Sequence, residues 1–229
     1  MNKNAIPHYF HPVVHVDNIA HAVEQACKAQ DAGAHGVWMI QHDGISLRAL
    51  EAAGAMKSIA PDFYVGVNLL GEPLLQAAEK AMDAQVDGIW FDYAGISSKG
   101  PTEHGLALFE LLQTAPMDVF AGAAFKYQEE EPDPAGAARQ ISSLGWIPCT
   151  SGSATGQAAN PGKTQLMRAA SQTGLGLASG VDADNIALYL PYVTHFLVAS
   201  SISENFTTLD FEKMYRLRRL MDKCLAENV

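Results

Sequence analysis

The chain has few charged residues, and basic residues are the scarcer kind. Charged side chains make up 17% of the 229 positions, and 15 lysines and arginines against 25 acidic residues give a formal net charge of -10. This balance repels phosphate backbones and anionic lipids at long range, so neither nucleic acid nor a membrane is an expected partner. A small phosphorylated molecule remains compatible with it, because backbone amides bind an anion locally while the net charge is remote and screened.

Cysteines and long apolar runs are also scarce. The three cysteines, Cys27, Cys149 and Cys224, are widely spaced and form no CxxC pair. This argues against a disulfide framework or a structural zinc site and fits a reducing compartment. No segment has enough unbroken apolar residues for a signal peptide or a membrane span. We therefore expect a soluble, cytoplasmic protein.

Short apolar runs alternate with alanine-rich segments of helical period along the whole chain. Runs without strict polar alternation are typical of parallel strands buried on both faces. The expected strands are Pro12–Val16, Gly36–Ile40, Tyr64–Leu70, Gly88–Tyr93, Met117–Phe125, Trp146–Cys149, Gly174–Ala178 and Thr194–Ser200. The expected helices are Asn18–Ala32, Leu47–Ile59, Pro73–Ala84, Glu103–Thr114, Pro134–Leu144, Gly162–Ser171, Ala183–Leu190 and Asp210–Ala226.

An internal similarity indicates that one unit is repeated. AQDAGAHGVWMI at Ala29–Ile40 resembles AMDAQVDGIWFD at Ala81–Asp92, and in both a helix end precedes a Gly-aliphatic-Trp strand. Eight such units without a break in composition predict a closed (β/α)8 TIM barrel that occupies residues 1–229 as a single α/β domain. The alternative is an open doubly wound sheet, but its GxGxxG fingerprint is absent after the first strand.

In a closed barrel, residues at the strand ends are candidates for the site, because active sites of this fold lie at the carboxyl ends of the strands. Polar residues follow every expected strand: His15 and Asp17, Gln41 and Asp43, Asn68, Asp92, Lys126, Thr150 and Ser151, Ser179, and Ser200 and Ser201. Contact with a ligand explains such a ring of polar ends better than solubility does.

The last three strand ends are rich in glycine and hydroxyl side chains. Loops after the seventh and eighth strands of many barrels bind phosphate, which predicts phosphate contacts at Ser179, Gly180, Ser200 and Ser201. The preceding loop, SGSATGQ, would close over the ligand through Ser151, Gly152, Ser153 and Thr155. Ordinary turns or a flexible lid are the competing interpretations of these residues.

Five further residues are candidates for the reacting end. Lys126 could be a Schiff-base nucleophile, a proton-transfer group or a fixed cation, or it could extend its charge into water. Asp92 could be a general base and Asn68 could orient a substrate, or both could hydrogen-bond to nearby loop backbones.

His15 and Gln41 are expected to position the ligand. His15 with Asp43 could also form an acid–base pair or bind a cation, but no ligand spacing supports this, so neither a metal nor a cofactor is predicted.

Several segments together resemble the BtpA family, barrel proteins named for a member implicated in photosystem I biogenesis. The resemblance covers most of the chain from about Gly33 onward, and it rests on the segments GVNLL, SGSATGQ, SGV…DNI and ASSIS…FTTLDFEKM. It implies a relative of phosphate-binding barrels. The chain departs from the family pattern at Gly122 and Ala124, where an aspartate and a histidine are frequent.

These observations predict a barrel that binds a small phosphorylated metabolite, a sugar phosphate or a nucleotide-derived compound, with isomerase-like or lyase-like chemistry. A non-catalytic metabolite sensor or assembly factor of the BtpA type is the alternative, which the residues at Gly122 and Ala124 favour. A homo-oligomer is the expectation for such a barrel.

Overall fold

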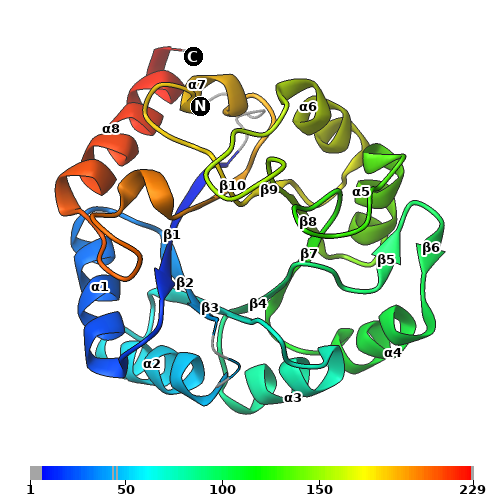
Figure 1. Ribbon diagram of the computed structural model, residues 1–229, viewed down its shortest axis with the longest axis horizontal. Coiled ribbons are helices and arrows are strands. Elements are labelled where there is room, and N and C mark those ends of the chain that lie inside the picture. The colour runs from blue at the N-terminus through cyan, green and yellow to red at the C-terminus, as the bar shows by residue number, and fades with distance from the viewer. Residues whose placement is uncertain (1–6, 43, 45, 228–229) are drawn as a thin grey trace.

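The computed structural model describes residues 7–42, 44 and 46–227, in which eight parallel strands close into a barrel (Figure 1). The strands are β1 (Tyr9–His15), β2 (Gly36–Gln41), β3 (Tyr64–Leu69), β4 (Gly88–Phe91), β7 (Asp118–Gly122), β8 (Ile147–Thr150), β9 (Gly176–Leu177) and β10 (His195–Val198). They follow one another around the ring in chain order, and β10 pairs with β1 to close it. The predicted (β/α)8 architecture is confirmed.

Helices follow the strands and lie on the outside of the ring (Figure 1). They are α1 (Ile19–Asp31), α2 (Ser46–Ile59), α3 (Leu74–Asp83), α4 (Glu103–Leu112), α5 (Pro134–Ser143), α6 (Pro161–Ala170), α7 (Ile186–Tyr189) and α8 (Phe211–Glu227). A short antiparallel pair, β5 (Ile96–Ser97) and β6 (Gly100–Pro101), and the 3-10 turn η1 (Ser200–Ile202) were not expected.

Short polar residues mark where several helices begin. The side chains of Asn18, Thr102 and Asp133 each accept a backbone N–H from the first turn of α1, α4 and α5. Such caps satisfy amides that have no partner within the helix, and a proline at the first helical position suits the same place. Pro134 and Pro161 occupy that position in α5 and α6. These signals placed both helix starts within one residue of the expected positions.

Alternate residues along each strand face opposite sides of the barrel wall. Val37 and Met39 of β2 pack outward against the helices, whereas Trp38 packs inside the barrel. Trp38 is fully buried, and glycines on neighbouring strands make room for its ring. A Cβ added at Gly66 would lie 2.3 Å from the Trp38 ring. The interior is therefore filled with side chains at this level.

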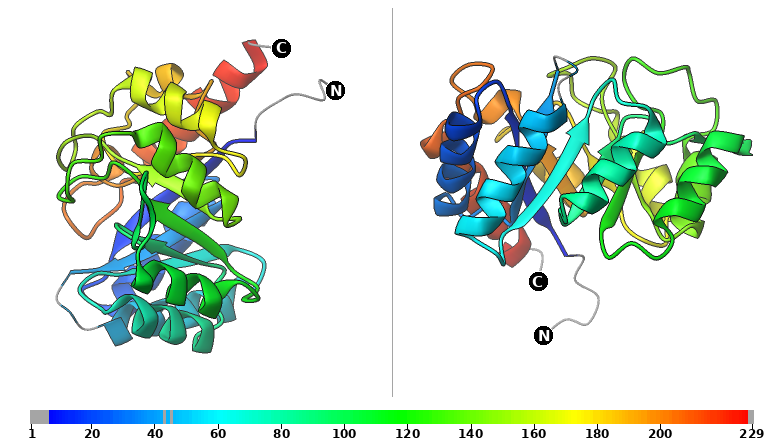
Figure 2. Two further views of the ribbon diagram at one scale, coloured as in Figure 1. Left: turned by 90° about the vertical axis from the view of Figure 1, so that its right-hand side faces the viewer. Right: turned by 90° about the horizontal axis from the view of Figure 1, so that it is seen from below.

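Parallel strands bring all eight carboxyl ends to one mouth of the barrel, and the side views show the helices alongside the strands (Figure 2). The loops that follow the strands gather at this mouth and position the candidate site. None of the helices in the described residues is long and apolar enough to cross a membrane.

Candidate functional site

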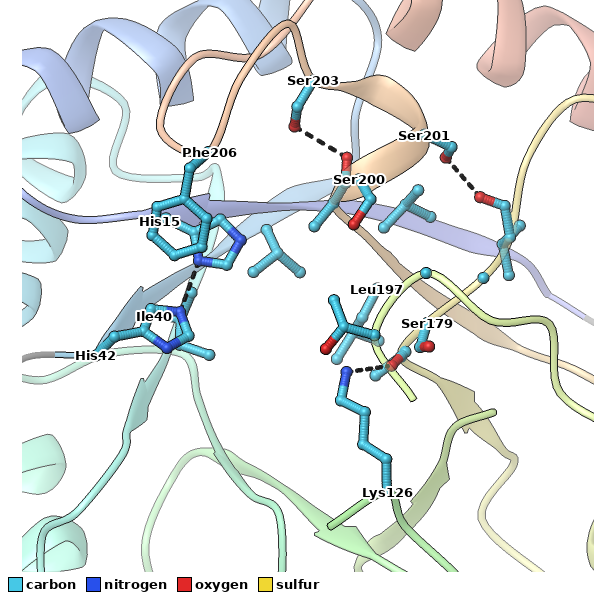
Figure 3. A pocket seen from close by; sticks show the side chains of 18 of the residues that line it. His15, Ile40, His42, Lys126, Ser179, Leu197, Ser200, Ser201, Ser203 and Phe206 are labelled. Carbon is cyan, nitrogen blue, oxygen red and sulfur yellow. Dashed lines mark hydrogen bonds between the residues drawn. The ribbon is translucent and has the colours of Figure 1, made fainter. Parts of the chain in front are cut away.

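A cavity of about 750 Å³ opens at the carboxyl ends of the strands. Eight of the residues expected from the sequence line it: His15, Asp92, Lys126, Thr155, Ser179, Gly180, Ser200 and Ser201. Figure 3 shows Lys126 and Ser179 on one side of the cavity, and His15 with His42 on the other. The structure thus brings together residues that lie up to 186 positions apart in the chain, from His15 to Ser201.

Asp92 and Lys126 are the charged residues of the predicted set that line the cavity. Asn68 is buried behind the cavity, and its Nδ2 donates to Oδ1 of Asp92 at 3.1 Å. Burial raises the pKa of Asp92, while the Asn68 hydrogen bond and the Lys126 charge act in the opposite direction. A carboxyl group in a cavity whose pKa is raised by burial is a candidate for proton transfer.

The ammonium of Lys126 points into the cavity from the loop after β7. Its Nζ lies 3.5 Å from the carbonyl oxygen of Ala178 and 5.5 Å from the centre of the Phe125 ring. The backbone N–H of Lys126 donates to Oγ of Ser151 at 2.8 Å, which ties its loop to the loop after β8. Figure 3 shows the side chain extended toward Ser179.

The backbone around Gly122 leaves no room for a side chain at this position. A Cβ there would lie 1.8 Å from the backbone oxygen of Asp92. Any side chain at Gly122 would therefore displace the end of β4, which carries Asp92. The backbone of this chain therefore has no room for the aspartate that the resemblance would place at this position.

Two segments, Ser179-Gly180 and Ser200-Ser201, form what we term the serine loops. Oγ of Ser179 donates to the carbonyl oxygens of Ala154 and Gln157 at 3.1 and 3.2 Å, and Oγ of Ser201 donates to that of Val181 at 2.5 Å. These two hydroxyls therefore hold loops together. The Oγ of Ser200 and the backbone N–H groups of Ser200 and Ser201 have no acceptor among the described residues.

Three rings form a second wall of the cavity, which we term the aromatic cluster: His15, His42 and Phe206. Nδ1 of His15 and Nε2 of His42 are 2.7 Å apart, and the Phe206 ring stacks on His15 with centroids 4.2 Å apart. Burial, His42 and Lys126 together lower the pKa of His15 to about 4. The His15 imidazole is therefore neutral at physiological pH.

His42 and Phe206 were not predicted from the sequence. His42 directly follows β2, so its position at a strand end could have identified it, but the prediction named Gln41, the residue before it. Phe206 lies beyond the last strand and begins the FTTLDFEKM segment, but nothing in the sequence indicates that its ring lies at the cavity.

The SGSATGQ segment divides between two cavities. Thr155 and Gly156 line the main cavity, whereas Ser151, Gly152 and Ser153 line a neighbouring one of about 510 Å³. The hydroxyl of Tyr127 accepts the backbone N–H of Thr155 at 3.1 Å and so ties this segment to the loop after β7. Of the four residues that were expected to close over the ligand, Thr155 lines the main cavity, and Ser151, Gly152 and Ser153 do not.

Lys163 of α6 is a further residue that sequence reasoning missed. Its Nζ donates to the carbonyl oxygens of Ala124 at 3.1 Å and Ser151 at 2.6 Å. Burial lowers the pKa of its ammonium. Lys163 thereby joins the loops after β7 and β8 at the base of Lys126.

Gln41 does not reach the cavity. It is buried, and it follows the inward-facing Ile40 by one residue, so it faces the helices instead. Asp43, the other candidate near this strand end, lies outside the described residues. Among the residues described, no group of three His, Cys, Asp or Glu side chains is arranged to hold a metal ion.

Comparison with known proteins adds the fold but no family. No family model matches the chain, and no curated protein matches it. Phosphoribosyl anthranilate isomerase from Thermus thermophilus is 15% identical with a TM-score of 0.67, and the match covers 94% of this chain and 98% of that one. The chain has the TIM-barrel fold.

Two other solved structures are similar at the same level. A structure described as native KDPGal is 12% identical with a TM-score of 0.71, and the match covers 95% and 96% of the two chains. A phosphoribosyl anthranilate isomerase in complex with reduced 1-(o-carboxyphenylamino)-1-deoxyribulose 5-phosphate is 13% identical with a TM-score of 0.66, over 94% and 99%. The resemblance to the BtpA family stays a prediction.

Proposed function

We propose that the cavity binds a small phosphorylated metabolite and transforms it by proton transfer, in an isomerase-like or lyase-like reaction. One observation carries the proposal: Lys126, Asp92 and both serine loops line the same cavity. An anion receptor and a proton-transfer group are thus within reach of one ligand. Similar barrels include an isomerase complex with a 5-phosphate compound, which makes phosphate binding by this fold a reasonable expectation.

The charge of the cavity has to accommodate a phosphate. Lys126 supplies the ammonium, and three carboxyl groups, of Asp92, Asp182 and Glu204, also line the cavity. Asp182 accepts the backbone N–H groups of Asp184 and Asn185 at 2.9 and 3.0 Å, and Asp92 accepts Nδ2 of Asn68. The backbone N–H groups of Ser200 and Ser201 and the Oγ of Ser200 add donors that carry no net charge. In this arrangement the phosphate lies between Lys126 and the serine loops.

The reacting end of the ligand lies beside Asp92 in this proposal. Asp92 removes a proton from a carbon next to a carbonyl group and returns it to a neighbouring atom, while Asn68 holds the carboxylate in place. The Lys126 charge also acts on Asp92, so the lysine that holds the phosphate also stabilises the negative charge that develops on the substrate oxygen beside Asp92. Neutral His15 positions the substrate by a hydrogen bond.

A non-catalytic role is a second candidate, and Gly122 and Ala124 favour it. The aspartate and histidine frequent in the BtpA family are absent at these positions. If those groups take part in the chemistry of that family, this chain keeps the pocket and has lost the reaction. Such a protein would sense a metabolite or support an assembly.

The test is a thermal-shift screen with inorganic phosphate, ribose 5-phosphate and triose phosphates, followed by turnover assays by proton NMR. We expect Lys126→Met to weaken binding by about tenfold or more, because a charge-assisted hydrogen bond is lost. We expect Asp92→Asn to keep binding and to lower turnover by about 100-fold or more. Lys99→Met, at an exposed lysine outside both cavities, is the matched control.

The outcomes separate the two candidates. Stabilisation by a phosphorylated compound without turnover supports the sensing role and rejects catalysis. Equal binding by wild type and Lys126→Met would reject the phosphate site as assigned.

A further inference from the structure

Phe206 lines the cavity, and the proposed chemistry gives it no role. Its side chain is 63% exposed, although it lies at the cavity and stacks on His15. A single exposed phenylalanine is ordinary on a protein surface. Its position at a cavity wall, and the way its loop is held, distinguish this one.

The loop that carries Phe206 is fixed by hydrogen bonds between residues that precede and residues that follow it in the chain. Oδ1 of Asn205 accepts the backbone N–H groups of Thr207 and Thr208 at 3.1 and 3.0 Å, and the N–H of Glu204 donates to the Thr208 carbonyl at 2.9 Å. Ser203 pairs with Leu209 in an isolated bridge below this turn. The ring is therefore preorganised, which lowers the entropic cost of binding a partner against it.

The other members of the aromatic cluster present unsaturated rings from different strands. His15 is the last residue of β1 and His42 directly follows β2, and the centroids of their rings lie 4.9 Å apart. The centroids of His42 and Phe206 lie 5.2 Å apart. Because the pKa of His15 is lowered to about 4, chiefly by burial, this imidazole is uncharged when a neutral ring packs beside it. Because Nδ1 of His15 is engaged with His42, its Nε2 is the nitrogen that can hydrogen-bond to a heteroatom of such a ring.

The cavity has two chemically different ends. Figure 3 shows the aromatic cluster on one side and Lys126 with Ser179 on the other. Leu70, Trp90 and Leu197 line the space with apolar surface. A volume of about 750 Å³ falls within the usual range of small-molecule and cofactor sites.

We infer that the ligand is a phosphate ester that carries a heteroaromatic ring, as a nucleoside monophosphate does, with its ring against the aromatic cluster. The inference rests on the proposed function for the phosphate end of the ligand. It decides between the two substrate classes that the sequence left open, in favour of a nucleotide-derived compound. The ring gains stacking contacts with Phe206 and a hydrogen bond with Nε2 of His15.

Matched probes separate the ring from the phosphate. Adenosine 5′-monophosphate and uridine 5′-monophosphate carry a ring and a phosphate, ribose 5-phosphate lacks the ring, and adenosine lacks the phosphate. Titration calorimetry with the full chain should give at least one nucleotide about tenfold tighter binding than ribose 5-phosphate, as expected for base–aromatic stacking. Saturation-transfer NMR should show contact between the base protons and the protein.

Variants assign the effect to the ring of Phe206. Phe206→Ala and Phe206→Leu should both weaken nucleotide binding, by about tenfold for alanine, and should leave ribose 5-phosphate binding unchanged. Leu166→Ala is the matched control, because Leu166 is 64% exposed and lies outside both cavities. Because Phe206 is exposed, we expect both variants to fold as the wild type does. Circular dichroism checks that they are folded.

Each result bears on a different claim. If ribose 5-phosphate binds as tightly as both nucleotides, or if Phe206→Ala weakens all phosphates equally, the inference is overturned and the proposed function stands. If neither nucleotide binds, the inference is also overturned, and the ribose 5-phosphate result decides the proposed function. Binding of adenosine that Lys126→Met does not affect, with no preference for its phosphate ester, would overturn both.

Discussion

Trp38 lies fully buried inside the barrel, below the level of the candidate site. Its ring fits there because the neighbouring residues Gly66 and Gly88 have no side chains. A Cβ at Gly66 would approach three atoms of its ring at 2.3 to 2.7 Å. A Cβ at Gly88 would lie 3.0 Å from the same ring and 2.1 Å from the Tyr64 hydroxyl. Because the ring and the barrel wall are both rigid, these contacts cannot be relieved by a rotamer change.

Gly66→Ala should therefore lower the free energy of unfolding by about 1–3 kcal/mol, the usual cost of overpacking a core. Urea denaturation measures this change. The matched control is Gly54→Ala in α2, where a Cβ would meet nothing within 4 Å. That control should raise stability by up to about 1 kcal/mol through helix propensity.

A double-mutant cycle with Trp38→Phe tests the cause. The smaller ring should reduce the cost of Gly66→Ala, giving a coupling of about 0.5 kcal/mol or more. Additive effects of the two substitutions would show that the Trp38 ring is not what the new methyl group meets.

At the scale of elements, Lys163 is the link between two loops and the helix that follows them. Its ammonium donates to the carbonyl oxygens of Ala124 and Ser151, and the Ser151 hydroxyl in turn accepts the N–H of Lys126. Ala124 has a φ of 48°, in the left-handed region that a residue other than glycine rarely adopts. The lysine thus stabilises a strained turn from which Lys126 projects.

Lys163→Met should lower stability by about 1.5–3 kcal/mol, because two carbonyl groups lose a charged donor while the aliphatic stem is kept. Hydrogen exchange should increase in residues 123–128 and 151–157 and stay unchanged in α2 and α3. Lys99→Met is the control in both measurements. Unchanged exchange in the two loops would mean that Lys163 does not hold them.

The elements of the fold could be predicted from the sequence because each carries local signals. The expected strand Gly36–Ile40 became Gly36–Gln41, and the expected helix Pro134–Leu144 became Pro134–Ser143. Buried apolar runs and helix caps act over a few residues, so they can be identified in the chain itself. The β5–β6 pair escaped prediction because its strands have only two residues each.

The candidate site could be predicted only in part, since side-chain direction depends on where each strand begins. His15, Asp92 and Lys126 reach the cavity, but Gln41 is one residue out of phase and faces the helices. The loop path that separates Ser151 from Thr155 depends on contacts with distant residues such as Tyr127. Phe206 follows no periodic pattern, so its stacking on His15 required the folded chain.

For the molecule as a whole, histidines are concentrated at the end of the barrel opposite the candidate site. Tyr9 stacks on His195 with centroids 4.8 Å apart, and His11 stacks on His195 at 5.9 Å. His11 is 3% exposed, and neither of its ring nitrogens has a hydrogen-bond partner among the described residues. Burial is the largest cause that lowers the pKa of five histidines: His8, His11, His15, His35 and His195.

These lowered pKa values predict that acid destabilises the fold. An unfolded histidine binds a proton below pH 6.5, whereas the folded His195 resists protonation until about pH 4. The unfolded state therefore binds more protons, and stability is fully present above pH 6.5 and declines as the pH falls below it. Each fully buried histidine contributes a slope of about 1.4 kcal/mol per pH unit in that range. Asp92 and Asp118 oppose this trend at its acid end, because burial raises their pKa above 3.8.

His11→Phe isolates one of these contributions. The ring volume is kept, two unpaired polar atoms are removed, and the slope of stability below pH 6.5 should fall by up to about 1.4 kcal/mol per unit. Urea denaturation at pH 5, 6, 7 and 8 measures the slope, with exposed His104→Phe as the control.

Stability at pH 7 should not decrease, because the buried imidazole of His11 has no hydrogen bond to lose. An unchanged slope in His11→Phe would mean that His11 is solvated in the folded protein, and a loss of stability at pH 7 would mean that its nitrogens have partners there.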